Sequence, residues 1–456
     1  MSNLGNTAVD DTLLAGKELS RPAPLWGLAG LGIAAIALTL VTLVAFRQGG
    51  DNGYMLAAVA SGLVALAAAG LAERMSGLQA LVIIAAVALL LRAIVLSVDP
   101  LLSTDIYRYI WDGRVQAAGI NPYGYVPADP ALAALRDGAI YPNINRAEYA
   151  VTIYPPIVQI LFFLITRIGE SVTTMRAAMV GCEAGLVLLL VLLLRRLDQP
   201  VTRIVGYVWH PLPVWEVANN GHVDILMVML MMLGVWLAVI GRPLHGAASI
   251  VLATLAKPFA IITLPTIWRP WDWRLPLLAL VIAAVCYLPY LSVGWNVFGF
   301  LTTGYLAEEG IVSGDQIWPL AAWRMLFGRM QMDASVYFAV GAAGLAAAAL
   351  LIAHRRASTA EKLPDIKRLL LAFLFLLSPN YPWYFLIVTP FVALGGGAPV
   401  WTMTIGAVLL QEEAWWDYTV PILIRKSVLF GAFLIACAYS VWSKSRQCPE
   451  QKASRQ

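Results

Sequence analysis

The sequence predicts an all-α protein, a polytopic transmembrane helical bundle of about 12–14 crossings. Of its 456 residues, 60% are hydrophobic and 13% are charged, whereas globular proteins carry roughly 25% charged residues. Apolar runs close to the ~20 residues that cross a bilayer recur along the whole chain. Lys and Arg stand near the ends of these runs, where they mark the cytoplasmic side.

We expect one transmembrane domain, residues 24–442, between two cytoplasmic tails. Residues 1–23 are rich in charged side chains and contain no short apolar core followed by a cleavage site, so they are read as an N-terminal tail rather than a signal peptide. Residues 443–456 form the second tail. Neither an internal repeat of fixed period nor a low-complexity linker divides the chain.

Three early spans, at 24–46, 54–72 and 77–98, deliver residues 99–154 to the outer face. This outer loop is polar and contains Asp and Arg residues and a turn-forming Asn-Pro-Tyr-Gly sequence. Long structured loops commonly carry function. The loop is therefore the first place to look for a site.

The loop begins with a predicted helix from Thr104 to about Gly119. The Thr104 hydroxyl can cap its first amides, and Gly119 can adopt a left-handed stop. Asp105, Arg108 and Asp112 then share one helix face. A solvated face with an intrahelical ion pair explains this pattern as well as a reactive site does.

The remaining apolar runs predict a series of later elements. Residues 157–168 are too short to span and suit a helix along the interface. Residues 245–268 are broken by Lys257-Pro258, as either a re-entrant pair of half-helices or a kinked span. Further spans are expected at 172–194, 203–217, 225–240, 275–291, 334–353, 367–378, 384–394, 399–411 and 427–442.

Basic residues at the span ends set the topology. Arg195-Arg196 and Arg355-Arg356 each follow an inward-running span, and Lys444 and Arg446 follow the last one. Both termini are then cytoplasmic, and residues 99–154 and 292–333 form outer loops. An acidic outer turn from Gln411 to Asp417 joins the last two spans.

Several motifs in this order resemble the GT-C superfamily of integral membrane glycosyltransferases. They are a Thr-Asp pair opening an outer helix, a Gly-x-Asn-Pro-Tyr turn at 119–123, Tyr-Pro-Pro at 154–156, Asn-x-His-x-Asp at 220–224, Lys-Pro at 257–258 and Pro-Trp-Tyr at 382–384. Within the superfamily the chain is similar to bacterial polyprenol-phosphate-mannose-dependent mannosyltransferases, over roughly residues 80–394. It departs from several relatives in having Asp105 and Asp112 instead of a tight acidic doublet.

The resemblance implies a membrane glycosyltransferase that moves a sugar, mannose by analogy, from a polyprenyl-phosphate donor to a lipid-linked or glycan acceptor. The reaction would invert the anomeric carbon, require no metal or other cofactor, and take place at the outer face of a bacterial inner membrane. Its partners would be membrane lipids, the donor and a glycolipid or glycan acceptor, and not nucleic acid. Asp105 matches the general base by position, although the helix dipole alone would also favour an acidic residue there.

The other candidate residues have weaker signals. Asp112 is a second catalytic candidate, although pairing with Arg108 or Arg114 would account for it. Two of the candidates for the donor phosphate have a structural alternative. For His222 it is burial as a structural group, and for Lys257 it is interfacial snorkelling. The phosphate candidates are His222, Lys257, Arg108 and Arg114, and the substrate-binding candidates are Asp224, Asn220, Tyr154 and Tyr384.

A multi-pass secondary transporter or lipid flippase is the alternative function. Such proteins also use broken helices and intramembrane charges. They are commonly built from two repeated halves, and this sequence shows no such repeat. The long polar outer loop favours the transferase.

Overall fold

A computed structural model of the chain describes residues 25–49, 51–300, 304–328, 332–411 and 419–453. In these ranges the secondary structure is helical throughout and contains no strand, which confirms the predicted all-α class. The tail at 1–23 and most of the turn between Gln411 and Asp417 lie outside the described residues.

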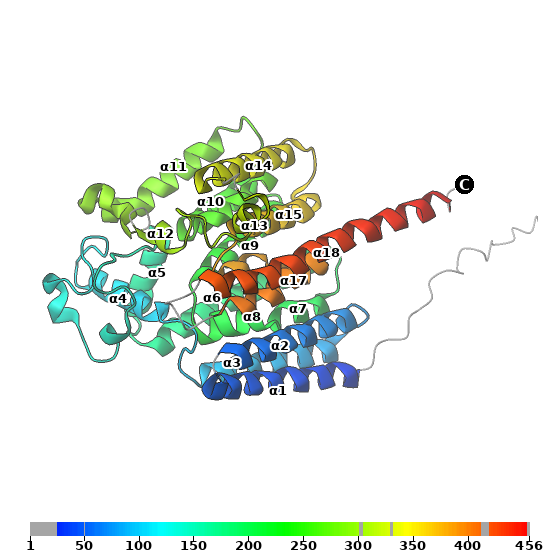
Figure 1. The fold of residues 1–456 in the computed structure, drawn as a ribbon, viewed down its shortest axis with the longest axis horizontal. Helices are drawn as coiled ribbons and strands as arrows, with labels where there is room; N and C mark the ends of the chain where they lie inside the picture. The colour runs from blue at the N-terminus through cyan, green and yellow to red at the C-terminus, as the bar shows by residue number, and fades with distance from the viewer. Residues whose placement is uncertain (1–24, 50, 301–303, 329–331, 412–418, 454–456) are drawn as a thin grey trace, which may run out of the picture.

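The first three spans form as the apolar runs predict. They are α1 (Leu25–Gly49), α2 (Asp51–Ala72) and α3 (Leu78–Leu96), and they lie side by side along one flank of the bundle (Figure 1). α1 packs against both α2 and α3. Each is long enough to cross the hydrocarbon core.

The polar segment after α3 folds into short helices at the end of the bundle away from the C-terminus (Figure 1). It contains α4 (Asp105–Ala117), η2 (Pro130–Leu135) and η3 (Tyr141–Asn143), and α5 (Pro156–Thr166) follows it. α4 ends where Gly119 adopts φ +77°, the predicted left-handed stop. α5 is short, as expected of a helix that does not span, and packs against α4.

The centre of the bundle is a run of short helices instead of the continuous span expected at 203–217. After α6 (Val172–Arg196), the chain passes through η4 (Val201–Ile204), α7 (Val205–Val208), α8 (Pro211–Pro213) and the π-helical turn η5 (Val214–Asn219). Pro211 and Pro213 lack the amide hydrogens that a continuous helix needs. α9 (Asp224–Val239) then leaves at 119° to the preceding segment.

The break predicted at Lys257-Pro258 is present. α10 (Pro243–Ala256) ends there and the 3₁₀ segment η6 (Pro258–Thr266) begins, because a residue before proline is held in an extended conformation. α11 (Arg274–Tyr287) continues into η7 (Leu288–Phe298).

The remaining elements include a second predicted break. α14 (Ala334–His354) and α15 (Thr359–Leu377) pack together, and α15 stops at Ser378, whose φ is +48°. The other elements are α12 (Leu306–Glu308), α13 (Trp318–Phe327), η9 (Pro382–Val388), α16 (Pro390–Leu394), α17 (Ala398–Gly406), η10 (Ala407–Leu410) and α18 (Thr419–Ala453).

Fewer continuous helices than the expected 12–14 crossings have the length and composition of a span. Within the described residues there are seven, or up to eight if the bent pair around His222 is one span. The expected crossing at 367–378 falls on α15, and those at 245–268, 384–394 and 399–411 fall on shorter apolar helices, at Pro243–Ala256, Pro382–Leu394 and Ala398–Leu410. Prolines and glycines at their ends keep these helices short.

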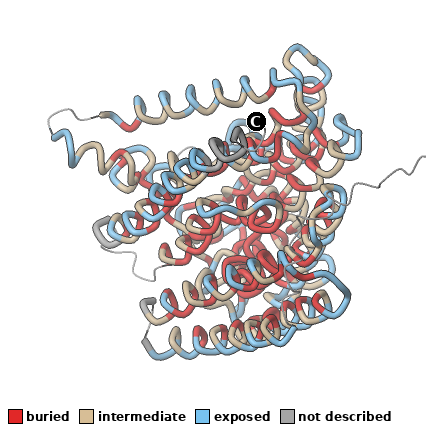
Figure 2. Tube along the Cα trace, turned by 90° about the vertical axis from the view of Figure 1, so that its right-hand side faces the viewer, coloured by how far each residue is buried: buried red, intermediate tan, exposed pale blue. Residues whose placement is uncertain are grey.

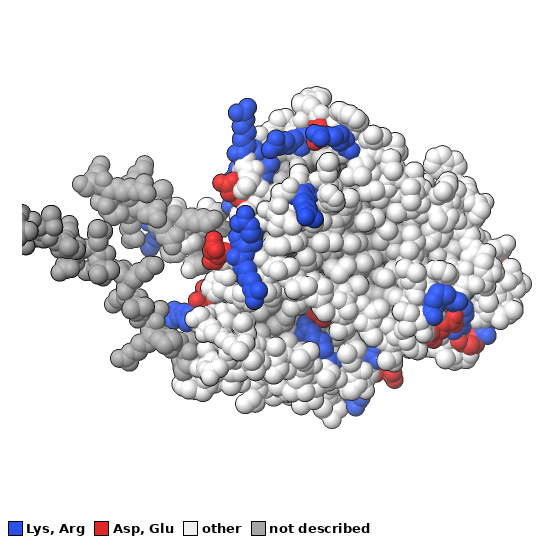
Figure 3. Space-filling view, turned by 180° about the vertical axis from the view of Figure 1, so that it is seen from behind, with Lys and Arg blue, Asp and Glu red and all other residues white. Residues whose placement is uncertain are grey.

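Buried residues gather along the middle of the bundle (Figure 2), and much of the face in Figure 3 carries no charged side chain. This arrangement suits a protein whose outer surface meets lipid. The interior holds an ion pair between Arg92 of α3 and Glu183 of α6, with 2.6 Å between Nη2 and Oε1. Each of these two interior charges is thus compensated by the other.

Candidate functional site

A cavity of about 380 Å³ lies where the outer segments meet the two helix breaks. Its walls come from the start of α4, the end of the outer loop, the break between α10 and η6, the segment 305–317, the break after α15, and the end of η10. Among its lining residues are four predicted site residues, Asp105, Tyr154, Lys257 and Tyr384.

Asp105 is the first residue of α4 and its side chain is 20% exposed. Oδ1 accepts a hydrogen bond from Asn145 Nδ2 at 2.7 Å. The helix cap differs from the prediction: the Thr104 hydroxyl makes no capping bond, and the Ser103 hydroxyl accepts from the Asp105 amide instead. The Asp105 carboxylate lines the cavity and accepts one hydrogen bond from the described residues, that of Asn145, so it keeps acceptor capacity.

Lys257 occupies the break between α10 and η6. Its Nζ lies 2.5 Å from Asp224 Oδ1 and 4.9 Å from the centre of the Tyr384 ring. The Asp224 side chain is 2% exposed, so its charge depends on this lysine for compensation. The proline break thus places the Lys257 ammonium group at the cavity wall, and Asp224, which lies behind the wall, holds it there.

His222 lies behind the cavity, not on its wall. It is 1% exposed and stacks on Trp383 with 4.2 Å between ring centres. Its Nδ1 is 4.0 Å from Asp105 Oδ2, and its Nε2 is 3.3 Å from Glu216 Oε2. A molecule in the cavity would meet Asp105 and Trp383 before this imidazole.

Asn220 positions the chain that leads into α4. Its Oδ1 accepts from the Leu102 amide at 3.1 Å, and its amide group donates to Glu216 Oε2 at 3.1 Å. Asn219 accepts from the Leu101 amide in the same way. Asn220 therefore does not line the cavity, but it holds the approach to Asp105.

Asp112 lies in a closed network away from the cavity. Arg108 Nε donates to its Oδ1 at 2.8 Å, and Thr152 Oγ1 and Gln159 Nε2 donate to its Oδ2 at 2.5 and 2.8 Å. Asp112 is 1% exposed and Arg108 is 5% exposed. Both predicted site residues are thus used in holding α4 to the following segment.

Arg114 faces the outer loop instead of the cavity. It pairs with Asp137 at 2.7 Å and with Glu170 at 2.8 Å. Burial opposes ionisation of Asp137, but bonds from the Ile140 amide and from Arg114 outweigh it and lower the pKa of Asp137 to about 2. Arg114 therefore ties the loop to the end of α5.

The two predicted tyrosines take part in aromatic walls of the cavity. Tyr154 packs edge-on against Tyr109 with 5.1 Å between ring centres. The Tyr384 hydroxyl lies 2.7 Å from that of Tyr305. Such walls present apolar faces and hydroxyl groups, which suit a sugar ring.

Arg146, Glu309 and Asn380 are among the polar residues of the cavity wall that were not predicted. Arg146 pairs with Glu308 at 2.6 Å across two distant segments. Glu309 is 6% exposed, and burial raises its pKa to about 7. Asn380 donates to Gln316 Oε1 at 2.8 Å. Asn380 lies within the Ser-Pro-Asn-Tyr-Pro-Trp-Tyr break, a local signal, whereas nothing local marks Arg146 or Glu309.

The cavity therefore combines a carboxylate that has free acceptor capacity with two cations. Arg146 and Lys257 both line the wall that holds Asp105. A carboxylate can take a proton from a hydroxyl, and cations can stabilise charge that develops on a departing phosphate. Aromatic and aliphatic side chains around them lower the local dielectric, which strengthens both effects.

Comparisons with known proteins point to one family. The model of a family described as "Alpha-(1->6)-mannopyranosyltransferase, N-terminal domain" matches residues 26–272, more than half of the chain. The chain is 29% identical over 179 residues to Alpha-(1->6)-mannopyranosyltransferase A of Mycobacterium tuberculosis, which covers 38% of this chain and 34% of the relative. The chain thus spans about a third of that relative's length. No solved structure matches.

Proposed function

We propose that this chain, which belongs to the alpha-(1->6)-mannopyranosyltransferase family, is an integral membrane mannosyltransferase. In this proposal it moves mannose from a polyprenyl-phosphate donor to a lipid-linked or glycan acceptor. The match contains Asp105, Asn145, Arg146 and Lys257, all within residues 26–272. The observation that carries the proposal is the cavity in which Asp105 shares a wall with Lys257.

Asp105 is the proposed general base. As the acceptor oxygen bonds to the anomeric carbon, the acceptor hydroxyl gives its proton to Asp105. The bond from the anomeric carbon to the phosphate oxygen breaks, and its electron pair leaves with the phosphate. A single displacement of this kind inverts the anomeric carbon.

Lys257 and Arg146 are the proposed phosphate partners. Lys257 is held by Asp224, and Arg146 by Glu308, so both charges are preorganised before the donor arrives. Arg108, Arg114 and His222 do not line the cavity and have no part in this proposed step. The donor would keep its isoprenoid tail in lipid.

The proposed orientation puts the cavity on the outer side of a bacterial inner membrane. Arg195 and Arg196 end α6 at the end of the bundle away from the cavity, as expected for the cytoplasmic side. The outer loops at 99–154 and 292–333 would then face the periplasm or cell exterior.

A transfer assay on the purified protein in lipid tests the reaction. We expect mannose to pass from labelled polyprenyl-phosphate mannose to a membrane glycan extract, and no transfer from a nucleotide-linked mannose. The product linkage should have the anomeric configuration opposite to that of the donor. Transfer from the nucleotide-linked sugar alone, or retention of configuration, would contradict the proposal.

A labelling experiment tests the orientation independently of the reaction. A cysteine placed at Pro130, in the outer loop, should react with a membrane-impermeant maleimide on intact spheroplasts. A cysteine at Ala357, between α14 and α15, is the control for the other side and should react only after permeabilisation. The reverse pattern would place the cavity on the cytoplasmic side.

A further inference from the structure

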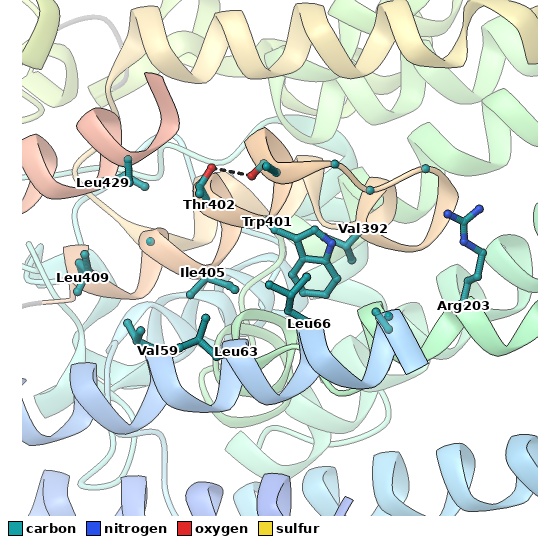
Figure 4. A pocket seen from close by; sticks show the side chains of 18 of the residues that line it. Val59, Leu63, Leu66, Arg203, Val392, Trp401, Thr402, Ile405, Leu409 and Leu429 are labelled. Atoms are coloured by element: carbon teal, nitrogen blue, oxygen red, sulfur yellow. Dashed lines mark hydrogen bonds between the residues drawn. The ribbon is translucent and has the colours of Figure 1, made fainter. Parts of the chain in front are cut away.

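A second cavity, of about 570 Å³, opens between α2, α17 and α18 (Figure 4). We call it the α2–α17 groove, and its volume lies within the ~300–1,000 Å³ of typical ligand sites. None of its residues lines the cavity that contains Asp105 and Lys257, which we call the reaction cavity. Its walls are mostly aliphatic, from Val59, Leu63, Leu66, Ala69, Gly70, Val392, Ile405, Gly406, Leu409, Val428, Leu429 and Ala432.

One end of the groove is polar. Arg203 and Glu73 line it and form an ion pair, with 2.9 Å between Nη2 and Oε1. The glycine turn at 395–397 is on the same wall. Figure 4 shows Arg203 at this end, Val59 and Leu409 toward the other, and Trp401 between them. A ligand that fits the groove has a polar head and an apolar tail.

Trp401 adds an unused hydrogen-bond donor to the groove. The residue is 7% exposed, and its ring stacks on His210 with 5.6 Å between ring centres. No acceptor among the described residues takes a hydrogen bond from its indole N–H. The indole nitrogen itself is not fully buried, so its N–H is open to a molecule in the groove. An oxygen atom of a ligand in the groove can therefore accept a hydrogen bond from it.

The groove has the length of one bilayer leaflet. Its wall on α2 runs from Val59 to Gly70, which is about 16 Å at the rise of an α-helix. Half of the hydrocarbon core is about 15 Å. An acyl chain that begins at the polar end would therefore end near the bilayer midplane.

We propose that the α2–α17 groove binds one glycerophospholipid. It takes one acyl chain of a lipid from the leaflet on the side where α2 ends, and the phosphate and ester oxygens of this lipid accept from Arg203 and from the Trp401 indole. Basic groups between transmembrane helices commonly hold lipid head groups in this way. The inference does not depend on the proposed transfer.

The polyprenyl-phosphate donor is a poorer match for this groove. Its phosphate must reach Asp105 in the reaction cavity. The reaction cavity comes nearest to the groove at Leu410, the last residue of η10. From the glycine turn at 397 to Leu410 is about 20 Å along α17 and η10. A phosphate at Arg203 would therefore lie at the wrong end of the groove.

Two variants separate this site from ordinary lipid contact. In Gly70→Leu, a side chain enters the groove without a clash, because a Cβ at Gly70 meets nothing within 4 Å, and leucine also favours the helix. Gly30→Leu is the matched control: Gly30 is equally open, lies on α1 and does not line the groove. Trp401→Phe removes the indole N–H and keeps an aromatic ring against His210.

The measurement is native mass spectrometry of the full chain after detergent delipidation and titration with phosphatidylethanolamine or phosphatidylglycerol. We expect one tightly retained phospholipid on the parental protein and on Gly30→Leu. Binding should fall more than tenfold in Gly70→Leu, and about fivefold in Trp401→Phe because one hydrogen bond is lost.

Equal phospholipid retention in Gly70→Leu and Gly30→Leu, with both proteins folded, would overturn the proposal. So would a polyprenyl phosphate that binds the parental protein and is displaced by Gly70→Leu, since the groove would then belong to the donor. The readout is bound lipid, so a failure of the transfer reaction leaves this test intact.

Discussion

Asp105 and Asp112 lie on the same helix, yet the structure gives them different surroundings. Asp112 accepts from Arg108, Thr152 and Gln159 and is buried from solvent. Asp105 accepts one hydrogen bond, from Asn145, and lines a cavity. A carboxylate whose acceptor sites are filled by protein holds a fold together, whereas one with free acceptor sites can meet a substrate. Of the two carboxylates on α4, Asp105 at its first residue is therefore the one that is open to a bound molecule.

The largest expected effect is on Asp105. Asp105→Asn keeps the size and an oxygen for Asn145 but removes the proton acceptor, so we expect transfer to fall by about 10²–10⁴-fold. The melting temperature should change little, since a carboxylate at a helix start contributes only ~0.3–1 kcal/mol. Turnover and melting temperature measured on the same preparation test this. Near-parental turnover would remove Asp105 from the role of base.

Asp112→Asn should show the opposite pattern. Arg108 is buried, so the substitution leaves a guanidinium without its counter-charge, which typically costs about 3–5 kcal/mol. Chemical unfolding should reveal this loss, while turnover per folded molecule stays close to the parental value. Abolished turnover with unchanged stability would move the base to Asp112 and reverse the comparison.

A third experiment asks whether Lys257 acts on the donor or only on Asp224. The double variant Lys257→Met with Asp224→Asn removes both charges, so no buried carboxylate is left unpaired. We expect a folded protein whose transfer falls about 10–100-fold, the usual scale of one charged hydrogen bond. The control is Arg92→Met with Glu183→Gln, a buried pair that does not line the cavity. Equal losses in both double variants would make Lys257 structural.

The smallest expected effect concerns Glu309. Burial raises its folded-state pKa from 4.5 to about 7, so the folded state favours the neutral acid. The corresponding stability is fully present below about pH 4.5 and is lost as the pH rises through about 7, by roughly 3 kcal/mol.

Melting curves of the parental protein and of Glu309→Gln from pH 4.5 to 8.5 measure this contribution. The parental protein should lose stability relative to the variant across the window. Arg146, Lys257 and Lys426 also act on Glu309 and partly offset the burial. Parallel pH profiles in the two proteins would show that the pKa of Glu309 is the same in the folded and unfolded states, as for an exposed carboxylate.

Local chemistry allowed much of the fold to be predicted. The apolar runs gave the long helices, and prolines marked the breaks at Lys257 and Ser378, because a proline restricts the residue before it and cannot donate a backbone hydrogen bond. The prediction of a continuous span at 203–217 was wrong for the same reason. The prolines of this segment break it into short helices. The backbone groups that lose their helical partners at these breaks can find new ones only in the surrounding bundle.

The site was predictable only in part. Asp105 and Lys257 lie at helix ends, which the sequence marks. Asp112 could not be assigned from the sequence, because two of its partners, Thr152 and Gln159, lie 40 and 47 residues further along the chain. Arg146 and Glu309 reach the cavity from loops whose path depends on tertiary packing. Helix-face reasoning alone placed Asp105 and Asp112 together, although their surroundings differ.

The short helix η10 lies between the α2–α17 groove and the reaction cavity. Leu409 lines the α2–α17 groove, and Leu410 lines the reaction cavity together with Gln411, which donates to the Leu102 carbonyl just before α4. A partition this thin transmits pressure from one side to the other, because closely packed side chains have little room to yield. We therefore expect the turnover of the proposed transfer to change with the thickness and the acyl-chain order of the surrounding bilayer.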